Sequence, residues 1–324
     1  MRAARCEIHG RPEGIVVREI DDPIAGPGEV IVAIEAAAVN YPDVLIAANQ
    51  YQVSVPTPYT VGNEFAGRIL STAEDVEGLA PGDAVMGTAF GGAFAEQIAV
   101  PAASVTPIPE GLDMVHAAAF NVTYRTAYHS LVTIGDMRPG DTVVVLGAAG
   151  GVGSACVDVA HRLGAKVIAA ASTRARADTC LTLGAVETIA YDDEDLKVRL
   201  KQITGRGADV IIDPVGGPYA EQALRAIAWG GRFVTIGFAQ GEIPRIPLNL
   251  VLLKGAVLKG FEIRTLAQYR PDAIPVAHEV LGRLVGEGMR PLVSEVFGLD
   301  DVPTALALMA ARKATGKIVI DTTR

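Results

Sequence analysis

The residues best suited to chemistry form a glycine cluster within residues 141–167, DTVVVLGAAGGVGSACVDVAHRLGAKV. Read as Ala-x-Gly-x-x-Gly, the cluster is a variant of the dinucleotide-binding fingerprint in which alanine replaces the first glycine. Small residues allow a tight turn and a close approach to a pyrophosphate, and N–H groups at the following helix start face the phosphates. The alternative is a glycine-rich turn without a ligand. The residues predicted to bind a dinucleotide are Ala148, Gly150, Gly151, Val152 and Gly153.

The end of the next predicted strand indicates which dinucleotide fits. Residues 166–178 read KVIAAASTRARAD, with nothing acidic before Asp178. A carboxylate at this place normally hydrogen-bonds the ribose 2′-hydroxyl of NAD. Hydroxyl and guanidinium groups instead suit a 2′-phosphate, through charge-assisted hydrogen bonds. We therefore expect NADPH rather than NADH, unless both arginines are simply solvated on a helix. The expected phosphate ligands are Ser172, Thr173, Arg174 and Arg176.

A parallel sheet is needed to position these residues, and the surrounding pattern predicts one. Between residues 141 and 237, the strand-sized runs TVVVLG, KVIAAAS, ETIAY, DVIIDPV and RFVTIG alternate with helical segments. Such alternation is typical of a doubly wound parallel sheet. Residues 1–122 instead have β-rich patterning punctuated by turns, and a helix-rich segment over 271–313 precedes a final strand in TGKIVIDTT.

Composition narrows the possible partners and compartments. The chain has 324 residues, half of them hydrophobic, and a net charge of −9. This length favours two domains. An acidic chain without a basic cluster argues against nucleic acid and anionic membrane surfaces as partners. The N-terminus shows no apolar signal segment and no run is long enough to span a membrane, so we expect a cytoplasmic protein.

Patterns typical of metal sites are missing from the sequence. The three cysteines, at positions 6, 156 and 180, are too widely spaced for a disulfide framework or a CxxC zinc site. We interpret each of them as a small buried hydrophobic residue. The five histidines are scattered along the chain, and we interpret them as surface or satisfied core residues. We therefore expect no bound metal.

Nine motifs spread over essentially the whole chain resemble the medium-chain dehydrogenase/reductase superfamily, most closely its zinc-free, zeta-crystallin-like quinone oxidoreductase branch. They are AAAVNYPDVLIAANQY, TVGNEFAG, GLAPGDAVMG, GGAFAEQIAVPA, NVTYRTAYHSL, GAAGGVGSACVDVAHRLGAKVIAAAST, DPVGG, AWGGRFVTIGFAQGEIPRIPLNLVLLKG and ATGKIVI. The resemblance implies an α/β fold with a GroES-like, β-rich catalytic domain at residues 1–122 and 267–324. It implies an inserted Rossmann domain with a doubly wound parallel sheet at residues 123–266, and a homodimer.

The resemblance also implies roles for single residues. Asn40 and Asp43 match an N-x-x-D pair near the nicotinamide, and Tyr51 matches a tyrosine that follows this segment; these three are the candidate catalytic residues. Further matched positions imply cofactor contacts by Thr126, Arg176, Tyr191, Gly237, Phe238 and Lys317. One departure is Thr123, where relatives often have asparagine, and it puts the detail of the nicotinamide contact there in question.

Zinc ligands of the related alcohol dehydrogenases have no counterparts in this chain. Those enzymes bind catalytic zinc through a cysteine in the first motif and a histidine in GHE. The matching positions here hold Val39-Asn40 and Asn63, and the remaining Glu64 cannot complete a tetrahedral site alone. Without zinc no Lewis acid polarises an alcohol or aldehyde oxygen. Alcohol oxidation is therefore not expected.

The resulting functional expectation is hydride transfer from NADPH to a small quinone, with Asn40 and Tyr51 orienting the acceptor oxygen. One alternative is reduction of activated C=C bonds in an enal, an enone, or an enoyl- or acryloyl-CoA. For a CoA phosphate, Arg264 and Arg270 are the only nearby basic candidates. Another alternative is an NADPH-binding protein with little turnover.

Overall fold

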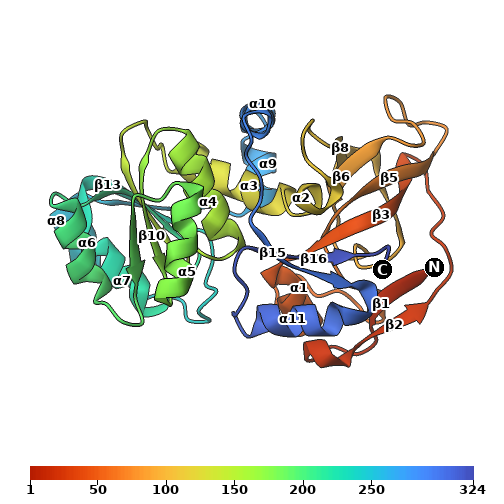
Figure 1. The fold of residues 1–324 in the computed structure, drawn as a ribbon, viewed down its shortest axis with the longest axis horizontal. Coiled ribbons are helices and arrows are strands. Elements are labelled where there is room, and N and C mark those ends of the chain that lie inside the picture. Colours follow the sequence, from red (N-terminus) through yellow and green to blue (C-terminus); the bar gives the residue numbers. More distant parts are fainter. The chain divides into compact units, whose positions relative to one another are not determined.

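The structure is a computed structural model that describes all of residues 1–324. The chain forms two compact units (Figure 1). Unit 1 comprises Met1–Val122 and Arg290–Arg324, and unit 2 comprises Thr123–Met289. Both ends of the chain thus build unit 1, and unit 2 is one continuous insertion. No helix in either unit has the length and apolar character needed to cross a membrane.

The second boundary between the units differs from the expected one. Residues 267–289, which the sequence pattern assigned to the catalytic domain, belong to unit 2. The reason is the packing of α10 (Ala273–Gly286), whose residues Ala277, Leu281 and Leu284 are buried. Just after this helix, the Glu287 carbonyl oxygen accepts a hydrogen bond of 3.3 Å from the Arg162 guanidinium of unit 2.

Unit 1 is built on two sheets. The larger follows the order β15-β16-β3-β5-β6-β8, with β7 also paired to β3, and the smaller follows the order β2-β1-β4. All these pairings are antiparallel except that of β15 with β16. The strands are β1 (Arg2–Cys6), β2 (Ile15–Glu19), β3 (Glu29–Val39), β4 (Tyr59–Thr60), β5 (Glu64–Thr72), β6 (Ala84–Thr88), β7 (Gln97–Pro101), β8 (Val105–Pro107), β15 (Val293–Gly298) and β16 (Lys317–Asp321).

Strand β3 is the structural centre of unit 1. Its first half alternates, with Val30, Val32 and Ile34 buried in the core of the unit. Its last four residues are all buried, and the strand leads through Asn40 into a short helix. The helices and 3-10 turns of unit 1 are η1 (Pro12–Gly14), α1 (Tyr41–Ala47), η2 (Ala102–Ser104), α2 (Met114–Ala118), η5 (Leu299–Asp301) and α11 (Val302–Ala310).

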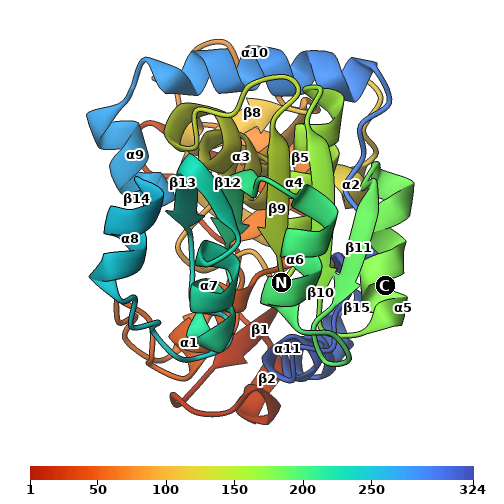
Figure 2. The same cartoon turned by 90° about the vertical axis from the view of Figure 1, so that its left-hand side faces the viewer.

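Unit 2 contains a six-stranded sheet in the order β11-β10-β9-β12-β13-β14, and every pairing in it is parallel (Figure 2). Its central strands are apolar and buried on both faces, which is typical of a doubly wound sheet. The order reverses between β9 and β12, and ligands of such sheets bind beyond the carboxyl ends of the strands at that place. The strands are β9 (Thr142–Leu146), β10 (Lys166–Ala171), β11 (Glu187–Ala190), β12 (Ala208–Asp213), β13 (Ile227–Thr235) and β14 (Val257–Gly260).

Helices cover both faces of the parallel sheet. Helices α4 and α5 lie on one face, and α6 and α7 lie on the other (Figure 1). The remaining helices follow the outer strands or flank the sheet. The helices and helical turns are α3 (Asn121–Tyr128), η3 (His129–Ile134), α4 (Gly151–Arg162), α5 (Arg174–Thr179), η4 (Cys180–Leu183), α6 (Leu196–Thr204), α7 (Gly217–Leu224), α8 (Leu248–Lys254), α9 (Ile263–Tyr269) and α10.

Candidate active site

The turn from β9 into α4 is shaped for the close approach of a ligand. Gly147 has φ of +57°, a left-handed conformation that favours glycine, and the next residue, Ala148, is buried. A Cβ on Gly153 would lie 2.2 Å from the Gly147 carbonyl oxygen, so the helix and the turn pack too closely for any side chain. Gly150 caps α4 without a side chain, which leaves the first N–H groups of a twelve-residue helix facing outward.

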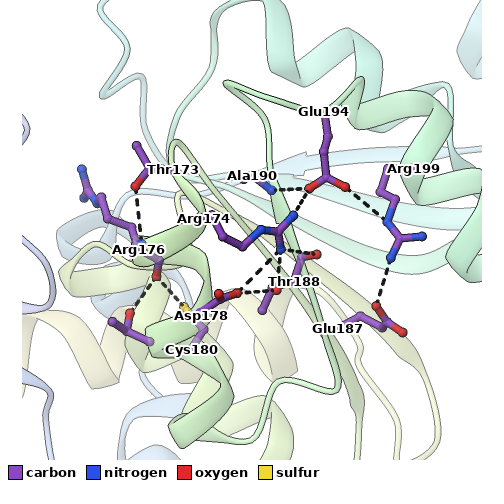
Figure 3. A network of polar contacts seen from close by, with 11 residues as sticks. Thr173, Arg174, Arg176, Asp178, Cys180, Glu187, Thr188, Ala190, Glu194 and Arg199 are labelled. Atoms are coloured by element: carbon purple, nitrogen blue, oxygen red, sulfur yellow. Dashed lines mark hydrogen bonds and ion pairs between the residues drawn. The ribbon is translucent and has the colours of Figure 1, made fainter.

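Arg174, expected to bind a ribose phosphate, forms its contacts with other side chains of unit 2. Its guanidinium forms an ion pair with Glu194, donates to the Thr188 hydroxyl at 3.0 Å and lies 3.6 Å from an Asp178 oxygen (Figure 3). These partners lie on α5, on β11 and just beyond that strand. Its charge is compensated by two carboxylates, and the side chain joins α5 to β11. Its predicted contact with a ribose phosphate stays a prediction.

Arg176 points away from this network (Figure 3). Thr173 caps α5, because its hydroxyl accepts the Arg176 N–H at 3.4 Å, and Ser172 directly follows β10. Burial raises the pKa of Tyr191 to about 12, and the nearby positive charge of Arg176 opposes that rise. The structure therefore brings Arg176 and Tyr191, two predicted cofactor residues, close together at the ends of β10 and β11.

An aromatic pair adjoins this group. The rings of Tyr191 and Tyr219 lie 4.2 Å apart between centroids, tilted by 36°. Tyr191 is fixed to the sheet, since its N–H donates to the Ala171 carbonyl oxygen at 3.0 Å. Tyr219, on α7, was not singled out from the sequence, because no local pattern predicts which helical ring faces the end of β11.

Two buried polar atoms without partners lie at the ends of β12 and β13. Asp213 accepts hydrogen bonds of 2.8 Å from Val215 and Gly216 through one carboxylate oxygen, while its other oxygen is buried and has no partner. The hydroxyl of Thr235, its register partner on β13, is also buried and without a partner. Buried polar atoms are normally satisfied, so a ligand is the simplest partner for this pair. Sequence reasoning missed both residues, although the DPVGG motif contains Asp213.

The other predicted cofactor residues of unit 2 lie on two further segments. Gly237 and Phe238 lie in the turn after β13, where a Cβ on Gly237 would lie 3.3 Å from the Pro214 carbonyl oxygen. Thr126 is partly buried on α3, and its carbonyl oxygen accepts the Ser130 hydroxyl at 2.5 Å. The turn after β13 therefore joins the glycine turn and Arg176 at the carboxyl end of the sheet, while Thr126 lies on a helix outside the sheet.

Unit 1 holds a buried polar cluster at the ends of three neighbouring strands. Asn40 follows β3, Glu64 begins β5 and Lys317 begins β16. The Lys317 Nζ donates to Asn40 Oδ1 at 2.7 Å and to Glu64 Oε2 at 3.0 Å, and all three side chains are buried. The ammonium group of Lys317 therefore holds Asn40 and Glu64 within unit 1, and its predicted cofactor contact stays a prediction.

The amide of Asn40 is fully used inside this cluster. Its Nδ2 donates to the Ala38 carbonyl oxygen at 3.2 Å and to Glu64 at 3.0 Å, while its Oδ1 accepts from Lys317. No amide hydrogen remains to orient a substrate oxygen. Asp43 in turn accepts the Asn40 backbone N–H at 2.7 Å and so fixes the start of α1. In the structure both residues hold neighbouring groups in place, and their predicted catalytic roles stay predictions.

Tyr51 lies apart from the cluster, on the segment after α1. It is partly exposed, and its ring centroid lies 6.4 Å from that of Phe90. Of the three predicted catalytic side chains, it alone combines a donor group with exposure to solvent. We therefore retain Tyr51 as the candidate for binding an acceptor oxygen.

The positions matched to zinc ligands have other tasks in the structure. Val39 is buried at the end of β3, and the Asn63 side-chain oxygen accepts the Gly91 N–H at 2.8 Å. No group of three or more histidine, cysteine, aspartate or glutamate side chains lies close enough together to hold a metal ion.

Asp43 makes the stability of unit 1 depend on pH. Burial raises the pKa of its carboxyl group to about 7 from 3.8, against the opposing effect of the Asn40 hydrogen bond, and one carboxylate oxygen has no partner. Between these pH values the folded protein binds more protons than the unfolded chain, so stability falls as pH rises from about 4 to about 7. Asp43→Asn should remove this pH dependence, so the stability difference between variant and wild type should change by about 4 kcal/mol over that range.

Urea unfolding followed by circular dichroism at several pH values measures this difference. Asp75→Asn is a matched control, because Asp75 is an exposed carboxylate that also accepts one backbone N–H, from Gly28 at 2.8 Å. A difference between wild type and Asp43→Asn that stays constant with pH would contradict the raised pKa.

Comparisons with known proteins identify the family. Residues 26–110 match the alcohol dehydrogenase GroES-like domain, and residues 151–279 match the zinc-binding dehydrogenase family. The quinone oxidoreductase-like protein 2 homolog of Nematostella vectensis is 36% identical over 99% of this chain and 89% of its own length. A phenolphthiocerol/phthiocerol polyketide synthase of Mycobacterium tuberculosis is 30% identical over 98% of this chain, but that match spans only 15% of the synthase.

Solved structures agree with the sequence relatives. The quinone oxidoreductase from Thermus thermophilus, whose complex with NADPH has been solved, is 30% identical with a TM-score of 0.85 over 99% of this chain and 100% of its own. A GroES-like domain, an all-parallel sheet and full-length relatives thus point to one family. The chain belongs to the quinone oxidoreductase-like branch of the medium-chain dehydrogenase/reductase superfamily.

Proposed function

We propose that this protein is an NADPH-dependent reductase that transfers hydride to a small quinone and needs no zinc. The main support for the proposal is the group of residues at the ends of β10 and β11, where Arg176 lies close to Tyr191. No acidic residue occurs between the end of β10 and Asp178, where an NAD-binding protein would have a carboxylate for the ribose 2′-hydroxyl. A guanidinium at this place favours a ribose 2′-phosphate. The relative from Thermus thermophilus, which binds NADPH, supports the same cofactor.

The residues of unit 2 fit this cofactor. The glycine turn and the outward N–H groups of α4 suit a pyrophosphate. The paired rings of Tyr191 and Tyr219 provide an aromatic surface beside Arg176, and the unpartnered Asp213 oxygen can accept a hydroxyl donor. When bound, NADPH supplies a hydride, and every other contribution must come from the protein's own side chains.

We infer the acceptor from the replacement of the zinc ligands of related alcohol dehydrogenases and from the hydrogen-bond donor that Tyr51 provides. A quinone accepts a hydride at low cost, because the product is aromatic, and a proton from solvent completes the hydroquinone. In our proposal the Tyr51 hydroxyl donates a hydrogen bond to the quinone oxygen, where negative charge develops during transfer. The buried cluster around Lys317 holds the strand ends from which α1 and the Tyr51 segment start.

Reduction of activated C=C bonds is the second candidate function. The observation that favours it is the similarity to part of a polyketide synthase over nearly the whole of this chain. The same donor would serve a carbonyl oxygen conjugated to the double bond. The acceptors would be enals, enones or enoyl thioesters, and the cofactor site would be unchanged.

Steady-state oxidation of NADPH tests the proposal against a panel of quinones, enals, enoyl-CoAs and simple alcohols. We expect turnover of a small quinone and none of the alcohols. Tyr51→Phe should lower kcat/KM for the quinone about tenfold, which corresponds to one hydrogen bond of about 1.4 kcal/mol, with unchanged NADPH binding. Tyr269→Phe is the control, because Tyr269 is an exposed tyrosine of α9.

Each class of result separates the candidates. Turnover of enones or enoyl-CoAs in preference to quinones would favour the second function. NADPH binding without turnover of any acceptor would favour a binding protein with little activity. Alcohol oxidation after exhaustive chelation would refute the reaction class, and stoichiometric zinc whose removal abolishes activity would refute zinc independence.

We also propose that two copies associate through the β14 edge of unit 2. Strand β14 is the last strand of the parallel sheet, so one row of its backbone groups has no neighbouring strand. Large apolar side chains around it are exposed, among them Trp229 on β13 and Leu252 on α8, both more than 80% exposed. Two antiparallel β14 edges make a self-complementary contact with two-fold symmetry.

The cytoplasmic location expected from the sequence stays a prediction.

Leu252→Glu should shift the protein from dimer to monomer, because it places two like-charged carboxylates against an apolar surface. Sedimentation velocity across a concentration series measures the shift. Leu70→Glu, on an exposed position of β5 in unit 1, is the control and should leave the dimer intact. A wild-type monomer at all concentrations, or a dimer unaffected by Leu252→Glu, would contradict this interface.

A further inference from the structure

Arg125, on α3, is a charged side chain without a partner. It forms no ion pair and no hydrogen bond, and its Nε is buried. Burial alone lowers the pKa of its guanidinium, and no carboxylate opposes this effect. Removing a cation from water is costly unless an anion compensates it. Most other arginines of unit 2 do have such a carboxylate, as Arg162 has in Asp158 and Arg232 in Asp141.

Two histidines share the surroundings of Arg125. His129 lies one helical turn after it and is fully buried, and its Nε2 has no partner. Its Nδ1 lies 2.9 Å from the Thr133 hydroxyl, so when that hydroxyl donates, Nε2 carries the hydrogen and becomes a free donor. His278 is contributed by α10.

The charge of Arg125 acts on both histidines. Burial first, and then the charges of Arg125 and His278, lower the pKa of His129 to about 4. Burial and the charge of Arg125 also lower the pKa of His278. Neither histidine has a carboxylate among the causes of its shift, and neither forms an ion pair. The group is thus a partly buried basic surface with several donors and no anion.

We propose that Arg125, together with His129 and His278, binds an oxyanion, either a carboxylate or a phosphate group. The guanidinium offers two parallel donors to such a group, and the His129 Nε2 hydrogen adds a third. We also assign the oxyanion to the hydride acceptor, because Arg125 is adjacent in sequence to Thr126, which the family resemblance predicts to lie near the nicotinamide. That last step rests on the proposed function, whereas binding of the anion itself does not.

Direct binding to the cofactor-free protein tests the site without turnover. Sodium acetate and inorganic phosphate are titrated separately at constant ionic strength, and the imidazole resonances of His129 and His278 are followed by NMR. We expect saturable shifts and a higher pKa of His129, because a bound anion favours its protonated form. Arg125→Leu should abolish saturation. Arg283→Gln, an exposed position on α10 paired only with Glu287, should bind like the wild type.

The stability of the variant separates binding from a structural role. Since Arg125 has no partner to lose, Arg125→Leu should be at least as stable as the wild type in thermal unfolding. Arg125→Gln gives a second variant that keeps a polar side chain without charge. Marked destabilisation of both variants, or saturable binding that survives in Arg125→Leu, would overturn the proposal, as would the lack of saturable binding by the wild type.

Matched acceptors identify the source of the anion. The carboxylate arm compares 4-oxo-2-pentenoate with its neutral methyl ester, and the phosphate arm compares crotonyl-CoA with crotonyl-pantetheine. In the arm whose anion matches that of the natural acceptor, Arg125→Leu should raise KM for the anionic acceptor about tenfold or more. The KM for the neutral analogue in the same arm should stay unchanged. Equal effects on both members of each pair would refute the assignment of the anion to the acceptor. Anion binding by NMR, without turnover of these acceptors or of any quinone in the panel above, would refute the proposed function and leave the anion site standing.

Discussion

Replacing Lys317 by methionine is expected to lower the free energy of unfolding of unit 1 by about 3–5 kcal/mol. The ammonium group of Lys317 lies 3.0 Å from Glu64 Oε2, and neither side chain is more than 3% exposed. Glu64 cannot reach water when its partner is removed, and its other oxygen is held by the Val122 N–H at 2.7 Å. The variant would therefore leave a buried carboxylate without its counter-charge. Asn40 would also lose the donor that fixes its Oδ1.

The measurement must distinguish the two units, because a chain with two compact units need not unfold in one step. Hydrogen exchange of the β3, β5 and β16 amides reports on unit 1. Hydrogen exchange of the β9, β10 and β12 amides reports on unit 2 and should change little. Lys317→Met combined with Glu64→Gln should recover much of the loss, because no buried charge then lacks a partner.

Lys313→Met provides the control for the loss of a lysine charge, since Lys313 is exposed four residues earlier. It should have the stability of the wild type. A loss below about 1 kcal/mol in Lys317→Met would show that the pair behaves like a surface ion pair, which the burial of both groups contradicts.

The parallel sheet could be predicted from sequence because its signals are local. The run TVVVLG overlaps β9 (Thr142–Leu146), and DVIIDPV overlaps β12 (Ala208–Asp213). Each is apolar and followed by glycine or proline, as a strand buried on both faces requires. Strand β14 was missed, because its four residues are mostly exposed and show no such run. The second boundary of the compact units lies after residue 289, later than the predicted domain boundary after residue 266, because the packing of α10 is a long-range property.

The site was less predictable, because its partners are distant in sequence. Lys317 and Asn40 are separated by 277 positions, and no spacing rule pairs them. The segment TGK led to the prediction of a cofactor contact for Lys317, and only the structure shows that its ammonium group binds Asn40 and Glu64. Arg125 was not noticed at all, because a lone arginine in a helical segment is normally solvated. Only the structure shows that no carboxylate lies beside it.

The two arginines after β10 show what local geometry could have added. Arg174 and Arg176 are two positions apart on α5, and residues at this spacing do not face the same side of a helix. Only one of them can therefore point at a given phosphate. The choice depends on Glu194, which lies beyond β11 and pairs with Arg174. With that carboxylate in place, Arg176 is the arginine that we assign to the ribose phosphate.

Arg176→Ala is accordingly expected to weaken NADPH binding about 10–100-fold while changing NADH binding less than about twofold. A charge-assisted hydrogen bond to a phosphate contributes about 1.5–3 kcal/mol, and NADH lacks the phosphate that would make it. Arg174→Ala is the matched control. It also removes one arginine charge, two residues before Arg176, but the side chain that it removes is bound to Glu194 and Thr188. It should lower stability slightly and leave the preference for NADPH intact. Dissociation constants measured by titration calorimetry for both cofactors decide between the two arginines. A loss of the preference for NADPH over NADH in Arg174→Ala, with no loss in Arg176→Ala, would reverse the assignment of the two arginines. Equal wild-type affinities for NADPH and NADH would refute a 2′-phosphate site at this strand end.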